Sequence, residues 1–303
     1  DGAVRPVRGI LPTVEAAARA GVESVVVPAD NAAEAALVPG VQVLGVRTLA
    51  EAWQAARGRG SRAFATSSPE PWPPGPDLAE VRGHAFGRRV LEVAAAGGHG
   101  LLMQGPPGSG KSMLARRLAG LLPELRDDEA LEVTRIRSAA GLLPGNMGLV
   151  RRPPLRAPHH SASVPAVVGG GRPLGPGEVT LAHRGVLLLD EVAEFPRAVL
   201  ESLRQPLEDG EVTVARAEAT LRFPAAFQLV ATRNPCPCGL YGASRGSCRC
   251  TEGERERYGA RISGPLLDRI DLVAWIDPES PGVLLGPAVG QPGAGVARQL
   301  PRR

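Results

Sequence analysis

The chain has 303 residues, a length that accommodates two domains, each with its own hydrophobic core. Its 43% hydrophobic and 22% charged residues are ordinary for a soluble globular protein, and its net charge of +4 is compatible with a polyanionic partner without indicating one. No apolar run reaches the roughly 18 residues of a membrane span, and no secretion-signal pattern opens the chain, so we expect no membrane partner and a cytoplasmic location.

The first 58 residues alternate between short strand and helix patterns. Runs of β-branched and apolar residues predict the strands, and Thr48 stands where a helix N-cap is expected. The expected strands span residues 4–10, 22–27 and 41–46, and the expected helices span residues 13–20, 31–38 and 48–56. Residues 1–58 are therefore predicted to form a small α/β domain.

Residues 59–76 are dense in proline and predict a stiff, extended linker. From residue 77 to residue 277 strands again alternate with helices, a pattern that favours a parallel sheet covered by helices. The expected helices span residues 85–96 and 113–122, and the expected strands span residues 101–104, 185–190 and 227–232. Residues 278–303 are rich in glycine, proline and alanine, and we expect this tail to be disordered.

A phosphate-binding P-loop is indicated at residues 105–112, which read Gly-Pro-Pro-Gly-Ser-Gly-Lys-Ser between an expected strand and an expected helix. In such a loop, backbone N–H groups and the positive end of the following helix surround phosphate oxygens. Lys111 is the only lysine of the chain, and its compact ammonium suits a tight phosphate cradle better than a planar guanidinium. A chance glycine-rich turn is disfavoured because every fixed position of the motif is present. The expected ATP-binding residues are Gly105, Pro106, Pro107, Gly108, Ser109, Gly110, Lys111, Ser112 and Met113.

The apolar run at residues 186–189 ends in Asp190 and Glu191, which is the acidic pattern expected beside a P-loop. Asp190, together with the Ser112 hydroxyl, would hold Mg²⁺, and Glu191 would polarise the attacking water. Alone, the run would be read as an ordinary buried strand with a charged end. The P-loop some eighty residues upstream disfavours that reading.

Two further polar residues are candidates for the same chemistry. Asn234 follows the expected strand 227–232, where a polar side chain can reach the γ-phosphate or the attacking water, although a strand-terminal asparagine is otherwise a turn former. Arg269 is a candidate arginine finger that completes a neighbouring subunit's site. A surface arginine paired with Asp268 or Asp271 has the same spacing, so both interpretations of Arg269 stay open.

All four cysteines lie in one short stretch, as Cys236, Cys238, Cys248 and Cys250. A cytoplasmic protein is a poor place for disulfides, whereas four thiolates on one loop can enclose a tetrahedral Zn²⁺. We favour a structural zinc site over four reduced surface thiols.

Eight segments together resemble one known family, the Mg-chelatase-like AAA+ ATPases of the YifB/ComM type. These segments are residues 77–84, 94–99, 105–112, 156–163, 176–183, 203–210, 234–239 and 263–269. The resemblance implies an AAA+ three-layer sandwich with a parallel sheet at residues 77–277, ATP hydrolysis with Mg²⁺, and assembly into a homo-hexameric ring. ComM-like members act as DNA helicases in branch migration during natural transformation, so single-stranded or branched DNA is the expected partner.

The resemblance also bears on the two ends of the chain. Residues 1–58 resemble part of a Lon-protease-like domain, of the ribosomal S5 domain 2-like kind. In proteolytic relatives a Ser–Lys pair performs the cleavage, so we expect no peptidase activity where the sole lysine belongs to the P-loop. After residue 277 the family's helical lid is expected to be missing.

In relatives, a β-hairpin after the acidic strand points into the pore of the ring, and residues 210–223 read as such a hairpin. Arg216 and Arg222 on this hairpin could contact the phosphates of threaded DNA, but solubilising arginines on an exposed hairpin are an equal alternative. Aromatic residues make up only 3% of the chain, which favours tracking of the DNA backbone over base stacking.

Two functions compete with the DNA motor. A chelatase-type motor subunit for Mg insertion into porphyrin shares the ATPase core, but the Lon-like part and the cysteine cluster favour the ComM-like reading. A truncated, non-catalytic nucleotide-binding remnant is the other alternative.

Overall fold

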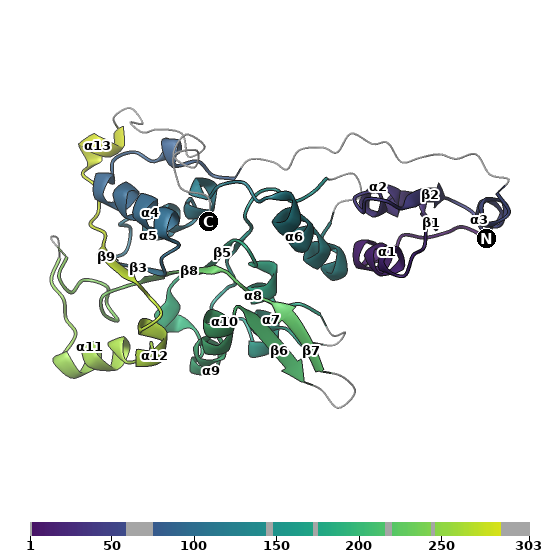
Figure 1. Ribbon diagram of the computed structural model, residues 1–303. Coiled ribbons are helices and arrows are strands. Elements are labelled where there is room, and N and C mark those ends of the chain that lie inside the picture. The colour runs from purple at the N-terminus through teal and green to yellow at the C-terminus, as the bar shows by residue number, and fades with distance from the viewer. Residues whose placement is uncertain are drawn as a thin grey trace. The chain divides into compact units, whose positions relative to one another are not determined.

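The computed structural model describes residues 2–58, 75–143, 148–171, 175–215, 220–243 and 246–285 (Figure 1). Its contacts divide the chain into two compact units. The first unit comprises Asp1–Pro73 and Leu125–Arg152, and the second comprises Pro74–Glu124 and Pro153–Arg303. The boundaries expected at residues 58 and 77 stay a prediction, and the structure adds residues 125–152 to the first unit.

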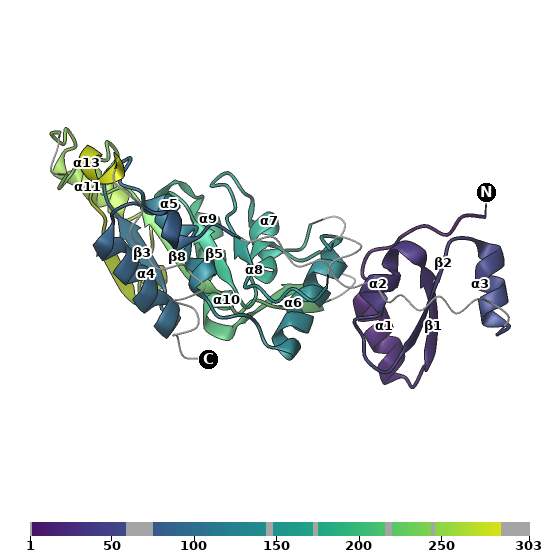
Figure 2. The ribbon, with the colours of Figure 1, turned by 90° about the horizontal axis from the view of Figure 1, so that it is seen from above.

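The first unit is a small α/β structure built on two parallel strands (Figure 2). Its elements are α1 (Ile10–Arg19), β1 (Ser24–Pro28), η1 (Ala29–Asn31), α2 (Ala32–Ala35), β2 (Gln42–Val46), α3 (Leu49–Ala56) and α6 (Asp127–Ala140). Apolar side chains of α1, α2 and both strands form its core, against which Leu131 of α6 packs. The expected cap of α3 is confirmed, because Thr48 Oγ1 accepts a hydrogen bond of 3.2 Å from the backbone N–H of Glu51.

The strand expected at residues 4–10 is wrong, because this segment forms long-range contacts and no ladder. The side chain of Asn31 accepts a hydrogen bond from the backbone N–H of Val7 and donates one to its carbonyl oxygen. Gly9, with φ +72°, donates its backbone N–H to the carbonyl of Ser138 in α6, and α1 begins directly after it. The helix therefore begins at Ile10, three residues before the expected start.

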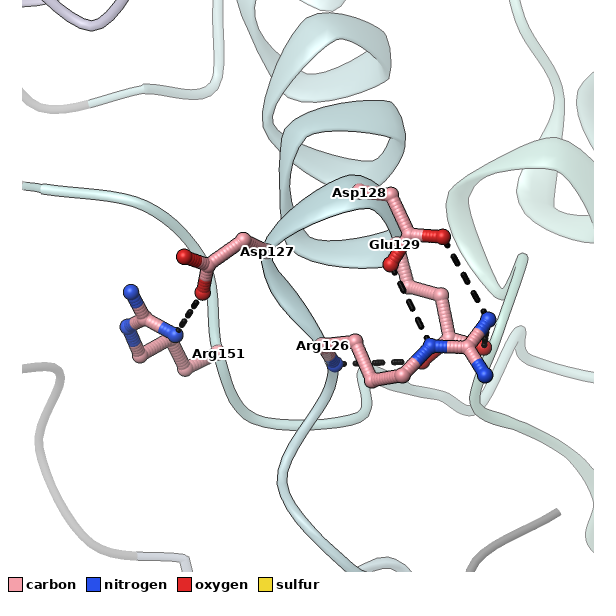
Figure 3. Close-up of polar contacts among 5 residues, drawn as sticks. All are labelled: Arg126, Asp127, Asp128, Glu129 and Arg151. Atoms are coloured by element: carbon pink, nitrogen blue, oxygen red, sulfur yellow. Dashed lines mark hydrogen bonds and ion pairs between the residues drawn. The ribbon is translucent and has the colours of Figure 1, made fainter.

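Charged side chains surround the first turn of α6 (Figure 3). The backbone N–H of Arg126, the residue before the helix, donates to Glu129 Oε2 at 3.1 Å, and its guanidinium pairs with Asp128. The hydrogen bond between the Arg126 guanidinium and Asp128 lowers the pKa of the Asp128 carboxyl and raises the pKa of the guanidinium. Arg151 pairs with Asp127. Three acidic residues in the first turn complement the positive end of the helix dipole.

The second unit is built on a five-stranded parallel sheet in the order β4-β5-β8-β3-β9 (Figures 1 and 2). The strands are β3 (Leu101–Gln104), β4 (Leu155–Arg156), β5 (Val186–Leu189), β8 (Gln228–Arg233) and β9 (Leu272–Trp275). The α-helices around it are α4 (Ala85–Gly97), α5 (Lys111–Ala115), α7 (Val164–Val168), α8 (Glu178–Leu181), α9 (Arg197–Ser202), α10 (Arg204–Asp209), α11 (Glu252–Gly259), α12 (Gly264–Leu267) and α13 (Pro281–Leu285). Short 3-10 turns are η2 (Leu78–Glu80), η3 (Leu118–Leu121) and η4 (Val192–Glu194).

Both faces of this sheet are covered, as its apolar strands require. Leu101, Met103 and Leu188 point to one face, where they pack with α4, α5 and η3. Leu102 and Leu187 point to the other face, where they pack with α7, α8 and α9. The predicted α/β three-layer sandwich with a parallel sheet is therefore confirmed.

The helix expected at residues 113–122 is shorter and divided. It begins at Lys111 and ends at Ala115, and η3 follows. The guanidinium of Arg117 donates to the carbonyl of Met113 at 2.9 Å, while its backbone N–H turns to the carbonyl of Leu114. The guanidinium thus satisfies the carbonyl of Met113 at the point where the α-helical hydrogen-bond pattern of α5 ends.

An antiparallel hairpin of β6 (Glu211–Ala215) and β7 (Thr220–Pro224) forms a separate two-stranded sheet, as expected (Figure 1). Most of the expected linker, residues 59–74, and residues 286–303 of the expected tail lie outside the described residues. Among the helices that the structure describes, none combines the length and the apolar character that a bilayer crossing requires.

Candidate nucleotide-binding site

The P-loop connects β3 to α5 at the carboxyl end of the sheet, which is where ligands of parallel α/β sheets bind. Gly108 and Gly110 have φ values of +74° and +80°, which glycine adopts without strain. The loop is packed closely, because a Cβ added to Gly105 would lie 2.1 Å from the carbonyl oxygen of Ile276. The sequence thus supplies small residues where the loop must turn its N–H groups inward.

Lys111 is buried in this loop, with 7% of its surface exposed. Its ammonium donates hydrogen bonds to the carbonyl oxygens of Gly105 at 2.8 Å and Pro106 at 2.7 Å. Burial lowers the pKa of the ammonium, and the carboxylates of Asp190 and Glu191 oppose that shift. The ammonium is therefore held inside the loop and interacts electrostatically with these two carboxylates.

Three oxygen atoms meet beside Lys111. The hydroxyls of Ser112 and Thr232 each donate a hydrogen bond of 2.6 Å to the same oxygen, Oδ1, of Asp190. The residues come from the start of α5, the end of β5 and the end of β8, so three separate segments converge on one point. Hydroxyl and carboxylate oxygens are the hard donors that Mg²⁺ prefers, and the donor set fits this ion.

Glu191 directly follows Asp190 and adopts φ +56°, a left-handed conformation that is uncommon for this residue type. Its backbone N–H donates to Thr232 Oγ1 at 3.0 Å. The strained backbone is thereby fixed by the neighbouring strand. Backbone strain of this kind concentrates at functional sites.

Thr232 is a site residue that the sequence analysis missed. Its hydroxyl donates to Asp190 and accepts from Glu191, so one side chain orients both acidic residues. It is 1% exposed. The signal in the sequence was its place as the last residue of the expected strand 227–232, two residues before the candidate Asn234.

We expect Thr232→Val to lower the rate of ATP hydrolysis about tenfold and to raise the Mg²⁺ requirement, because Asp190 loses a hydrogen bond worth about 1.4 kcal/mol. Thr232→Ser keeps the hydroxyl and should retain most of the activity. Steady-state hydrolysis measured across Mg²⁺ concentrations checks this. Equal rates for the valine and serine variants would show that the hydroxyl is not needed.

His84 also lies at the loop without having been assigned a role. A Cβ added to Gly110 would lie 2.9 Å from His84 Nε2. Burial lowers the pKa of His84, an effect that the carboxylate of Glu279 partly offsets. Its backbone N–H donates to Glu279. The signal was its place at the end of the segment 77–84, which carried part of the family resemblance.

Asn234 lies directly beyond β8, at the same end of the sheet as the P-loop. Its neighbour Arg233 is the last residue of β8, and its guanidinium donates two hydrogen bonds to Gln104 Oε1 on the adjacent strand β3. Burial lowers the pKa of Arg233. The structure places Asn234 at the predicted edge, and its role as a sensor stays a prediction.

Arg269 is not brought to the P-loop of its own chain. Its guanidinium pairs with Glu208 at 2.7 Å, and both side chains are about half exposed. Its carbonyl oxygen packs against Gly100, directly before β3, whereas the P-loop follows the other end of that strand. The backbone of Arg269 therefore lies at the end of β3 opposite to the P-loop, and its role as an arginine finger stays a prediction.

Of the two hairpin arginines, Arg222 lies among the described residues. Arg222 on β7 is 74% exposed at its side chain and lies 3.6 Å from Glu211 Oε1 across the hairpin. Arg216 lies outside the described residues. Their contact with DNA stays a prediction.

The four cysteines form one cluster. All four Sγ atoms lie within 4.8 Å of one another, and the three separations among Cys236, Cys238 and Cys248 are 3.4, 3.7 and 3.7 Å. A tetrahedral zinc with bonds of about 2.3 Å separates its sulfur ligands by about 3.8 Å. The donor set therefore fits Zn²⁺.

Comparison with known proteins agrees with this geometry. Residues 77–283 match the family model described as magnesium chelatase, subunit ChlI. The chain is 53% identical over 274 residues to the uncharacterised protein Rv2897c of Mycobacterium tuberculosis, covering 90% of this chain and 54% of that protein. It is 44% identical to YifB of Escherichia coli, covering 93% and 55%, and 43% identical to the competence protein ComM of Haemophilus influenzae, covering 89% and 54%.

The chain thus spans about half the length of the curated relatives that it matches. The predicted resemblance to YifB- and ComM-type proteins is confirmed. Since the family model covers more than half of its residues, the chain belongs to the family of magnesium chelatase, subunit ChlI.

Proposed function

We propose that the second unit binds ATP with Mg²⁺ at the P-loop and hydrolyses it, as an AAA+-type motor. The observation that carries the proposal is the convergence of Ser112, Asp190 and Thr232 beside Lys111. Lys111 would exchange its bonds to loop carbonyls for bonds to phosphate oxygens. Ser112 and Asp190 would hold the metal ion, which neutralises phosphate charge when bound. Glu191 would orient and deprotonate the attacking water.

We further infer that the motor is a homo-hexamer that acts on single-stranded or branched DNA. The placement of Arg269 is compatible with assembly, because its half-exposed side chain lies away from the P-loop of its own chain. The similarity to a competence protein supports DNA as the partner. The exposed hairpin offers Arg222 to the phosphate backbone, and Arg216 is proposed beside it.

The test is the ATP hydrolysis rate with and without single-stranded and forked DNA. We expect DNA to raise the rate, and Arg222→Ala to weaken DNA binding and reduce its salt dependence by about one released counterion. Arg89→Ala is a matched control, because Arg89 is also 74% exposed and paired with a nearby glutamate, Glu92. An ATP hydrolysis rate that DNA does not change would contradict the DNA motor. Equal effects of the two variants on DNA binding would contradict the role of Arg222.

A chelatase-type motor for Mg insertion into porphyrin is the second candidate, because the matching family model is named for a chelatase subunit. Hydrolysis stimulated by the porphyrin-binding chelatase subunits and not by DNA would favour it. Nucleotide binding without hydrolysis under either condition would favour a non-catalytic remnant.

We also infer that Cys236, Cys238, Cys248 and Cys250 hold a structural Zn²⁺. The mutual distances of their sulfur atoms support this, and the ion would close a loop without taking part in the reaction. One equivalent of zinc in the purified protein is the expected result of metal analysis, and its absence would leave four free thiols.

A further inference from the structure

The cysteine loop touches the phosphate-binding loop. Gly239 lies against Pro107, since a Cβ added to Gly239 would come within 2.7 Å of the Cγ and Cδ atoms of that proline. The same added atom would lie 3.9 Å from Cγ of Asn234. Gly239, the residue that follows Cys238, therefore lies between the P-loop and the end of β8.

We propose that a zinc ion bound by the four cysteines holds Gly239 against Pro107, so that metal occupancy sets the affinity of the P-loop for nucleotide. The proposal rests on the nucleotide-binding function proposed above. It gives the zinc ion a role in positioning the P-loop, in addition to closing the cysteine loop.

The turn that carries Gly239 is built from the proposed ligands. Cys236 is fully buried, and its carbonyl oxygen accepts a hydrogen bond of 2.9 Å from the backbone N–H of Gly239. Its sulfur lies 3.4 Å from the backbone nitrogen of Tyr241. Gly239 adopts φ +79°, a conformation suited to glycine. The shape of the turn thus depends on where the sulfur atoms of Cys236 and Cys238 are held.

Two contacts fix the remainder of the loop to the second unit. Gly242 packs against the ring of Trp275 in β9, because an added Cβ would lie 3.2 Å from it. Arg255 of α11 donates to the carbonyl oxygen of Cys250 at 2.8 Å and stacks over the ring of Tyr241 at 4.5 Å. The cysteine cluster therefore lies between two anchored points and the P-loop contact.

The described residues of this loop, 235–243 and 246–251, include no helix or strand, and Cys238 and Ser247 are exposed. A bound metal ion would fix the positions of the four sulfur atoms through its bonds to them. Loss of the ion removes these bonds and should therefore loosen the turn and with it the support of Pro107.

The experiment compares nucleotide affinity with metal content in the full chain. A fluorescent ADP analogue is titrated in Mg²⁺ before and after zinc is removed with a chelator selective for zinc over magnesium. We expect zinc removal to weaken binding about tenfold and zinc addition to restore it. Ser247→Ala, which changes the same loop without removing a ligand, should match the wild type.

A second variant tests the contact without removing the metal. Gly239→Ala should keep one equivalent of zinc yet bind the nucleotide analogue about tenfold more weakly, because its Cβ collides with Pro107. Gly246→Ala is the matched control: Gly246 has a similar φ of +85°, but its added Cβ would make only an ordinary contact of 3.4 Å with Leu240. That control should bind within about twofold of the wild type.

The outcomes separate the two proposals. The inference is supported if Gly239→Ala binds nucleotide more weakly while Gly246→Ala does not, and if the affinity of the wild type depends on zinc. Equal affinity of the two glycine variants, or an affinity unchanged by zinc removal, overturns it while leaving the ATP site intact. A wild-type protein that binds nucleotide but carries no zinc also overturns it. A zinc-loaded protein that binds no nucleotide overturns the proposed function instead.

Discussion

Lys111→Met is expected to weaken binding of ATP with Mg²⁺ by roughly 100-fold, the largest loss of affinity predicted for a single substitution. Charge-assisted hydrogen bonds contribute about 1.5–3 kcal/mol each, and the loss of one or two of them to phosphate corresponds to this factor. The ammonium is already desolvated and held at the loop by the carbonyls of Gly105 and Pro106, so little further ordering opposes its transfer to phosphate. Equilibrium titration with a fluorescent nucleotide measures the effect.

Lys111→Arg is predicted not to restore this affinity, because a planar guanidinium does not fit where a 7% exposed ammonium reaches two carbonyls. Arg116→Met serves as the control, since it removes a positive charge from an exposed position directly after α5. Affinity within about threefold of wild type for Lys111→Met would contradict the assignment of the phosphate site.

Glu191→Gln is expected to preserve nucleotide binding and to reduce hydrolysis by about 10²–10³-fold. A positioned general base contributes about 10²–10⁴-fold, and the amide keeps the shape of the side chain without its basicity. The hydrogen bond to Thr232 comes from the backbone N–H of residue 191, so the variant should keep it. Release of inorganic phosphate, measured at saturating ATP, together with a binding titration distinguishes lost chemistry from lost affinity.

Glu194→Gln is the matched control for this variant. Glu194 lies three residues farther along, pairs with Arg261 at 2.9 Å and is partly exposed. Its neutralisation should leave the turnover rate within about twofold of the wild type. If the two variants lose activity equally, Glu191 is not the base, and general disturbance of η4 explains the loss.

Strands and local caps could be predicted from the sequence because short-range patterns determine them. The apolar run at residues 101–104 coincides with β3, and the run ending at Leu189 coincides with β5. Both strands are buried on two faces, so continuous apolar runs followed by the P-loop and acidic motifs identified them. Asp190 and Ser112 were paired because an acidic residue after an apolar strand is the pattern expected beside a P-loop, and the structure joins them by a hydrogen bond of 2.6 Å.

The remainder depends on contacts between residues far apart in the chain. Residues 4–10 have a strand-like composition, but their partners are Asn31 and the carbonyl of Ser138. The hydroxyl of Thr232 acquires its role only when β8 lies beside β5, which places it 2.6 Å from Asp190. Single-sequence patterns do not encode such pairings.

The burial of Lys111 has a practical consequence for chemical labelling. Because the chain has one lysine, a reagent that acylates amines has a single side-chain target in it. That target is 7% exposed and held by the carbonyls of Gly105 and Pro106, so a reagent reaches it poorly in the folded state. The acylation rate of one amine thus reports opening of the P-loop, and a bound nucleotide would slow it further. The protein carries its own site-specific footprinting probe.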